Sequence, residues 1–154
     1  MRVQTFLLSL AILIFAGACV AKTGVTNFDD TQIANGEIAK ERHFKGAFSN
    51  GMKGDSIFFN VSSDNKKLTN LTFKGYWRCN GKLERISTGP DGGFNVVNGI
   101  VKGHISEPPN GGSTAWRFDI DNTIIGNNAS GTFRMNINNL GCDTYLLKFT
   151  AIAE

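Results

Sequence analysis

Few side chains in this sequence have the types and spacing that catalysis needs, and three carboxylates come nearest to them. Asp119 and Asp121 lie two residues apart in a segment of alternating polarity. A strand would place both on one face, about 7 Å apart at a rise of about 3.3 Å per residue. Paired carboxylates at such a spacing can hydrolyse a glycosidic bond, and with Asn122 nearby they can contribute to a Ca²⁺ site. Neither set is complete, so a small hydrolase acting through Asp119, Asp121 or Glu107 is an alternative hypothesis only.

The histidines and cysteines form no complete catalytic or metal-binding set. His43 and His104 are far apart in the chain, and no Gly-x-Ser-x-Gly nucleophile motif accompanies them. Metal ligands usually come as close pairs, and no Cys or His lies two to five residues from Cys79 or Cys142. We therefore predict no bound metal, no cofactor and no catalytic residue.

Two of the three cysteines are expected to form a disulfide. Cys19 falls in the N-terminal segment, so Cys79 and Cys142 remain as an even pair. In an oxidising compartment such a pair predicts a disulfide. Because the bond would close a long loop, the chain-entropy model gives it about 4 kcal/mol of stabilisation. A metal site or a catalytic thiol is the competing interpretation.

One predicted strand carries a candidate ligand-binding face. Apolar and polar residues alternate over 71–79, and a strand places the two sets on opposite faces. The apolar, inward set of this segment includes Leu71, Phe73 and Trp77. Lys74, Tyr76 and Arg78 then face the solvent. An aromatic ring flanked by hydrogen-bond donors can bind a sugar or a protein partner, although one exposed Tyr between charged residues is also an ordinary solvated surface.

Alternation and turn signals recur along the chain and predict about eight short antiparallel strands. Further inward sets are expected at Trp116, Phe118 and Ile120, at Phe133, Met135 and Ile137, and at Tyr145, Leu147, Phe149 and Ala151. Asn80-Gly81 and Asn98-Gly99 are typical of tight turns, although the second also allows a strand with a bulge. Strands with one apolar face bury it between two sheets or inside a barrel. We predict an all-β fold that forms a β-sandwich, with a closed up-and-down β-barrel as the alternative.

The N-terminal segment is predicted to lie outside this β domain. Arg2 precedes an apolar run over 6–15 that is followed by small residues, which is typical of a secretory signal peptide. The predicted division is a signal peptide over 1–21, a polar leader over 22–42 and a single β domain over 43–154. The stretch ending at Cys19 also resembles a bacterial lipobox without its usual Leu, and lipidation there would anchor the protein to a membrane.

Charge and composition restrict the expected partners and location. The formal net charge is +3 and no large basic cluster is present, so neither nucleic acid nor an anionic membrane surface is expected as a partner. A membrane would be reached only through the lipid anchor. The protein is expected to be secreted, or to lie in the periplasm or at the cell surface, with an outer-membrane lipoprotein as the alternative.

Several strand-forming segments carry a resemblance to known proteins. They are residues 46–49, 57–62, 129–133 and 147–151, and the two cysteines accompany them. Together they resemble a group of uncharacterised secreted bacterial β-domains, over most of residues 43–152. This resemblance implies a secreted β-fold with one disulfide, and no activity. The Gly-x-aromatic strand starts are also similar to those of avidin-like and lipocalin-like barrels, whose ligand residues have no counterparts here.

These features favour a non-catalytic binding module of the cell surface or periplasm. Its unknown ligand is expected to be a carbohydrate or a cell-envelope protein, bound at Lys74, Tyr76 and Arg78. Two alternatives stay open, namely the small hydrolase or glycosidase described above and a barrel that carries a small apolar ligand inside.

Overall fold

The computed structural model describes residues 40–154, most of which lie in strands. In chain order the elements are β1 (Arg42–Phe48), β2 (Ser56–Val61), β3 (Lys67–Cys79), β4 (Lys82–Thr88), β5 (Phe94–Asn95), β6 (Ile100–Glu107), β7 (Trp116–Ile125), β8 (Asn128–Ile137), the 3-10 helix η1 (Asn138–Leu140), β9 (Cys142–Asp143) and β10 (Leu147–Ala153). No helix in this part of the chain is both long and apolar enough to cross a membrane. The predicted signal peptide, the lipobox at Cys19 and the leader up to residue 39 lie outside the described residues.

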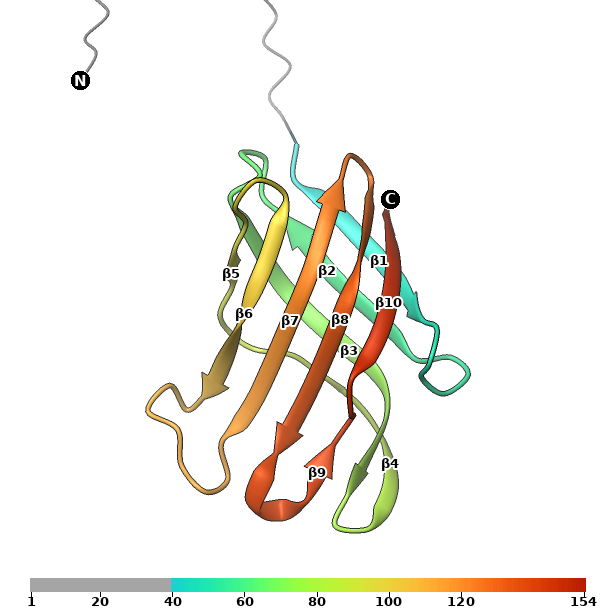
Figure 1. Ribbon diagram of the computed structural model, residues 1–154, viewed down its shortest axis with the longest axis vertical. Helices are drawn as coiled ribbons and strands as arrows, with labels where there is room; N and C mark the ends of the chain where they lie inside the picture. Colours follow the sequence, from blue (N-terminus) through green and yellow to red (C-terminus); the bar gives the residue numbers. More distant parts are fainter. Residues whose placement is uncertain (1–39) are drawn as a thin grey trace, which may run out of the picture. The chain divides into compact units, whose positions relative to one another are not determined.

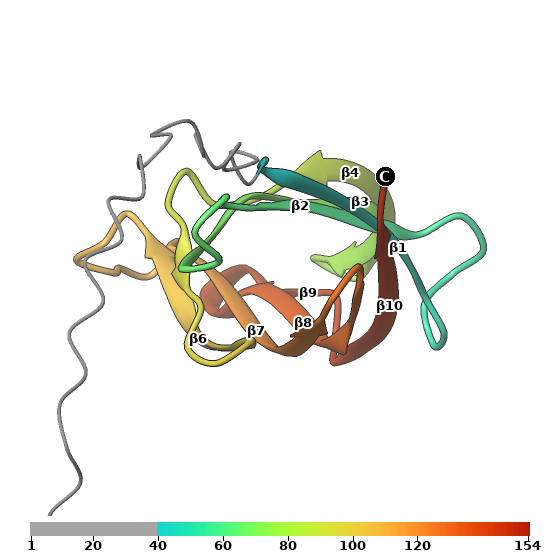
Figure 2. The same cartoon turned by 90° about the horizontal axis from the view of Figure 1, so that it is seen from above.

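The strand pairings are antiparallel and close into a ring. Its order is β10-β1-β2-β3-β9-β8, and β8 pairs again with β10. Beyond the ring, β7 and β6 continue the sheet from β8, whereas β4 and β5 pair with β3 (Figure 1). Seen from above, β2 and β3 face β7 and β8 across the interior (Figure 2). The predicted all-β antiparallel fold is confirmed, and the pairings give it the closed form of the barrel alternative.

Aromatic rings fill the interior of the barrel. Phe73 stacks on Phe133 with ring centroids 5.7 Å apart, and Phe44 stacks on Phe59 at 5.0 Å. The inward sets predicted for β3 and β8 are buried, namely Leu71, Phe73 and Trp77 and Phe133, Met135 and Ile137. Trp116 is half-buried and stacks on Trp77 at 5.1 Å. The alternation read from the sequence therefore gives the correct register of both strands.

The predicted inward set of the last strand contains one error. Leu147, Phe149 and Ala151 are buried, but Tyr145 is 60% exposed. β10 begins only at Leu147, and Tyr145 belongs to the connection from β9, where its φ is +56°. A residue in the left-handed region breaks the two-residue repeat of a strand, so the alternation cannot be extended back to Tyr145.

Two Asn-Gly pairs form the tight turns that their sequence predicts. Asn80 and Gly81 both have positive φ, at 50° and 76°, and connect β3 to β4. Asn98-Gly99 has φ values of 51° and 75° and is flanked by a bridge between Val97 and Ile100. It is therefore a turn, and the bulge alternative for this pair is wrong. Two consecutive positive φ values are the signature of a type I′ hairpin.

The predicted disulfide joins Cys79 at the end of β3 to Cys142 in β9. It lies next to the one residue pair between these strands, Arg78 with Asp143. Such a bond is typical of proteins that fold in an oxidising compartment, so it is compatible with an extracellular or periplasmic location.

Candidate functional site

A cleft of about 300 Å³ lies where the barrel wall is incomplete. The pairing of β2 with β3 ends at Ser56 and Lys74, and β9 pairs with β3 only at Arg78. Residues 75–77 of β3 therefore have no strand partner on that side. The β1–β2 loop, the β3–β4 hairpin and the connection from β9 to β10 supply the walls of the cleft.

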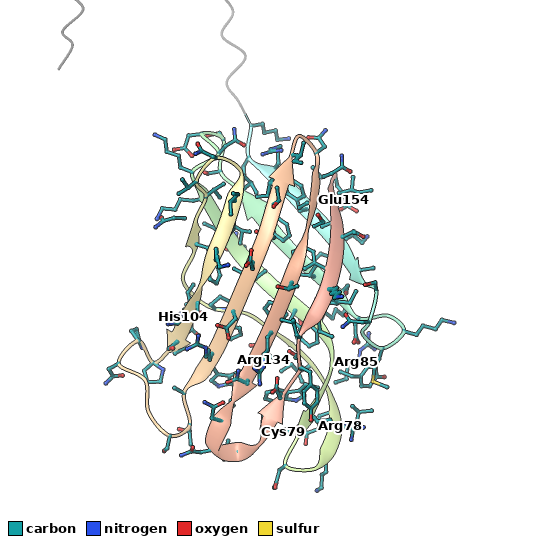
Figure 3. All side chains as sticks on the ribbon, in the orientation of Figure 1. Arg78, Cys79, Arg85, His104, Arg134 and Glu154 are labelled. Atoms are coloured by element: carbon teal, nitrogen blue, oxygen red, sulfur yellow. A yellow bond between two sulfur atoms is a disulfide. The ribbon has the colours of Figure 1, made fainter. Side chains whose placement is uncertain are left out.

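Two of the three residues predicted to bind a ligand line this cleft. They are Tyr76, which is half-buried, and Arg78, which is exposed. Lys74 is exposed on the same strand but is not among the lining residues. The guanidinium carbon of Arg85 on β4 lies 5.8 Å from the centroid of the Tyr76 ring, a favourable cation–π distance. Figure 3 shows Arg78 and Arg85 near Cys79, at the β3–β4 end of the barrel.

Four exposed apolar side chains also line the cleft, and the sequence alone did not place them there. They are Met52, Leu83, Tyr145 and Leu146, with exposed fractions between 47% and 60%. Scattered exposed apolar residues are normal, but several around one hollow favour a binding surface. These four come from three separate segments. Only Leu83 had a local sequence signal for its place in the cleft, because it follows the tight Asn80-Gly81 turn and pairs with Arg78.

A buried carboxylate holds two walls of the cleft together. Asp55 is only 4% exposed and accepts hydrogen bonds from the backbone N–H of Met52 at 2.8 Å and of Tyr76 at 3.0 Å. The second bond gives the Tyr76 N–H an acceptor at a point where β3 has no neighbouring strand. Gly75 is needed beside it, because a Cβ at that position would lie 2.6 Å from Asp55 Oδ1. Asp55 therefore positions the β1–β2 loop against β3.

Replacing Asp55 by alanine is expected to lower the free energy of unfolding by about 2 kcal/mol, because two backbone N–H groups lose their acceptor. Asp55→Asn keeps one carbonyl oxygen and should lose less. Urea denaturation of both variants gives the measurement. Asp91→Ala is the control, since the Asp91 side chain is exposed. If Asp55→Ala were as stable as this control, the positioning role would be wrong.

The opposite wall is held by Asp143. Its Oδ1 accepts hydrogen bonds from the Tyr145 N–H at 2.7 Å and from Nε of Arg134 at 3.0 Å. The hydrogen bond to Asp143 also raises the pKa of Arg134. These contacts hold Tyr145 in the left-handed conformation that turns its ring out to the cleft. Residues other than glycine adopt this conformation at a cost, and such residues cluster at functional sites.

The predicted catalytic carboxylates lie on a different surface, and two of them come together there. Asp119 and Asp121 line a hollow of about 330 Å³ that also includes His104 and Leu146. His104 is directly opposite Asp119 in the β6–β7 pairing. Glu107 is not among the lining residues.

Each of these carboxylates already has a partner. Asp119 binds Nε and Nη2 of Arg117 at 2.8 to 3.0 Å, and this hydrogen bonding raises the pKa of Arg117. Asp121 forms an ion pair with Lys102 at 2.8 Å. Within residues 40–154, no three His, Cys, Asp or Glu side chains come together as a metal site. The hollow is therefore a weaker candidate than the cleft.

The cleft is chemically suited to holding a ligand. It combines an aromatic ring, a guanidinium group and apolar side chains, and its lining among the described residues includes neither histidine nor cysteine. A small number of polar groups in a mainly apolar hollow is the usual composition of a ligand site. Comparison of this chain with protein-family models, with curated proteins and with solved structures finds no match.

Proposed function

We propose that the domain is a non-catalytic binding module and that its ligand binds in the cleft at Tyr76 and Arg78. The observation that supports this most is that these two outward β3 residues and four exposed apolar side chains line the same cleft, which has a volume of about 300 Å³. A Tyr ring offers a large contact area with little conformational entropy to lose, and a guanidinium group supplies directional donors.

Two further observations favour this surface over the alternatives. The aromatic rings packed inside the barrel favour a site on its outside over an apolar ligand in its interior. The ion pairs of Asp119 and Asp121 favour binding over hydrolysis, because both carboxylates are already engaged by protein cations and not free for a substrate.

We further propose that the protein acts outside the cytoplasm, after removal of residues 1–21 or lipidation at Cys19. The disulfide supports this, because cytosolic thiols are normally kept reduced. A glycan or a cell-envelope protein is the partner that this location suggests.

The double variant Tyr76→Ala with Arg78→Ala is expected to bind the ligand at least about tenfold more weakly, because it loses both the ring and the charged donor. A glycan array, read beside a pull-down from the native envelope, provides the ligand, and titration calorimetry then compares the two affinities. Circular dichroism checks that the variant folds.

A matched control changes two residues far from the cleft. Lys66 and Lys67 are exposed at the β2–β3 turn, so Lys66→Ala with Lys67→Ala should leave the affinity unchanged. An unchanged affinity in the Tyr76 and Arg78 variant as well would place the binding site elsewhere.

A further inference from the structure

Two arginines beside the cleft have no hydrogen-bond or ion-pair partner among the described residues, and they are Arg78 and Arg85. The other three arginines of residues 40–154 donate to oxygen atoms of the protein, namely Arg42 to Gly126 and Asn65, Arg117 to Asp119 and Arg134 to Asp143. The two guanidinium groups left for a ligand are thus on neighbouring strands. Arg78 lines the cleft, whereas Arg85 lies beside it and is not among its lining residues.

The β3–β4 pairing arranges these residues in a checkerboard. Tyr76 is directly opposite Arg85, and Arg78 is directly opposite Leu83, all on the outward face. The two arginines therefore occupy one diagonal and the two apolar residues the other. Diagonal neighbours in an antiparallel pair are about 7 to 8 Å apart, which lets two long side chains reach one anion.

The acidic groups nearby do not neutralise these arginines. Asp143 is occupied by Arg134 and the Tyr145 N–H, and Asp55 is buried against two backbone N–H groups. Glu84 lies between Leu83 and Arg85 in β4 but is paired with the inward residue Trp77, so it belongs to the other face. The outward face thus has positive charge that a bound anion would balance.

Apolar side chains continue from the arginines along the cleft. Leu83, Tyr145 and Leu146 are 48%, 60% and 55% exposed. A volume of about 300 Å³ is at the small end for ligand sites, so the cleft suits a ligand with one short chain or one ring. Positive charge beside exposed apolar side chains is complementary to a ligand with an anionic head and an apolar body.

We infer that the ligand of this cleft is a small carboxylate that carries an apolar group. Its carboxylate binds between Arg78 and Arg85, and its apolar part lies against Leu83, Tyr145 and Leu146. The inference rests on the proposed function, since it names the chemical class of the ligand for the same site. A free aliphatic acid and the carboxyl terminus of a peptide ending in an apolar residue share this chemistry.

Titration of the ¹⁵N-labelled protein with matched probes tests the inference. Octanoate, octan-1-ol and octylammonium have the same chain and differ in the charge of the head group. Octanoate is expected to shift the amide signals of the cleft residues with a Kd at least about tenfold lower than either other probe, because guanidinium–carboxylate bonds are charge-assisted. N-acetyl-leucine represents the carboxyl terminus of a peptide. A lower Kd for N-acetyl-leucine than for octanoate would favour a peptide as the source of the carboxylate, and the reverse order would favour a free aliphatic acid.

The variant Arg78→Ala with Arg85→Ala should lose the preference for octanoate over octan-1-ol, whereas Lys66→Ala with Lys67→Ala should keep it. Both arginines are exposed, so the variant is expected to fold, and its amide spectrum checks this. If octan-1-ol shifted the cleft signals with the same Kd as octanoate, the inference that the ligand is a carboxylate would be wrong. The cleft would still be a binding site. If octanoate shifted only signals outside the cleft, the inference would fail, and the Tyr76 and Arg78 double variant would decide separately on the proposed function.

Discussion

Replacing Phe73 by alanine is expected to lower the free energy of unfolding by about 3 to 5 kcal/mol. Phe73 is fully buried and packs with ring centroids 5.7 Å from both Phe133 and Phe48. These partners come from β8 and β1, so truncation would remove contacts across the interior and leave a cavity between the layers. Urea denaturation followed by circular dichroism gives the measurement.

Phe58→Ala is the matched control for this variant. Phe58 lies on the neighbouring strand and pairs with Thr72, but it is half-buried on the outward face. Its loss should be about 1 kcal/mol or less, because the solvent-facing part of the ring contributes little. Equal losses in the two variants would mean that the core does not lie on the Phe73 face of β3.

Removing the disulfide is expected to lower the free energy of unfolding by about 2 to 5 kcal/mol. Cys79 and Cys142 are 63 residues apart, so their bond strongly restricts the unfolded chain. It also joins the neighbouring strands β3 and β9, which are otherwise paired only at Arg78 and Asp143. The double variant Cys79→Ala with Cys142→Ala, unfolded in urea beside the wild type, measures the difference.

Reduction provides an independent check of the same bond. Dithiothreitol should shift the urea midpoint of the wild type towards that of the double variant and should have no effect on the variant itself. Mass spectrometry under non-reducing conditions should find the two cysteine peptides linked. A wild-type midpoint that does not respond to the reductant would contradict the stabilising role.

Features with a local cause could be predicted from the sequence. The alternation that places Phe73 and Trp77 inside depends only on the two-residue repeat of a strand, and it gives the correct register. The same repeat could not place Tyr145, because a hydrogen bond to Asp143 fixes a conformation that interrupts it. The disulfide followed from the exclusion of Cys19, which needs no three-dimensional information.

Features that depend on distant segments could not be predicted. A sandwich and a barrel use the same alternation, and the decisive fact is that β10 pairs with both β1 and β8. The cleft has the same origin. Met52, Leu83 and Leu146 carry no shared sequence pattern, and only the closed ring brings their segments to one opening. The sequence therefore predicted that Tyr76 and Arg78 lie on an outward surface. It could not predict which apolar side chains lie beside them.

The pairing of the first described strand with the last has a consequence for the order of folding. Phe44 in β1 lies opposite Ala153 in β10, so the wall cannot be completed until β10 has been synthesised. Contacts so distant in sequence make folding slow, typically milliseconds to seconds for domains of this type. A chain of this topology stays incompletely folded until β10 has been synthesised, and until then the apolar faces of β1 and β8 lack one of their partner strands.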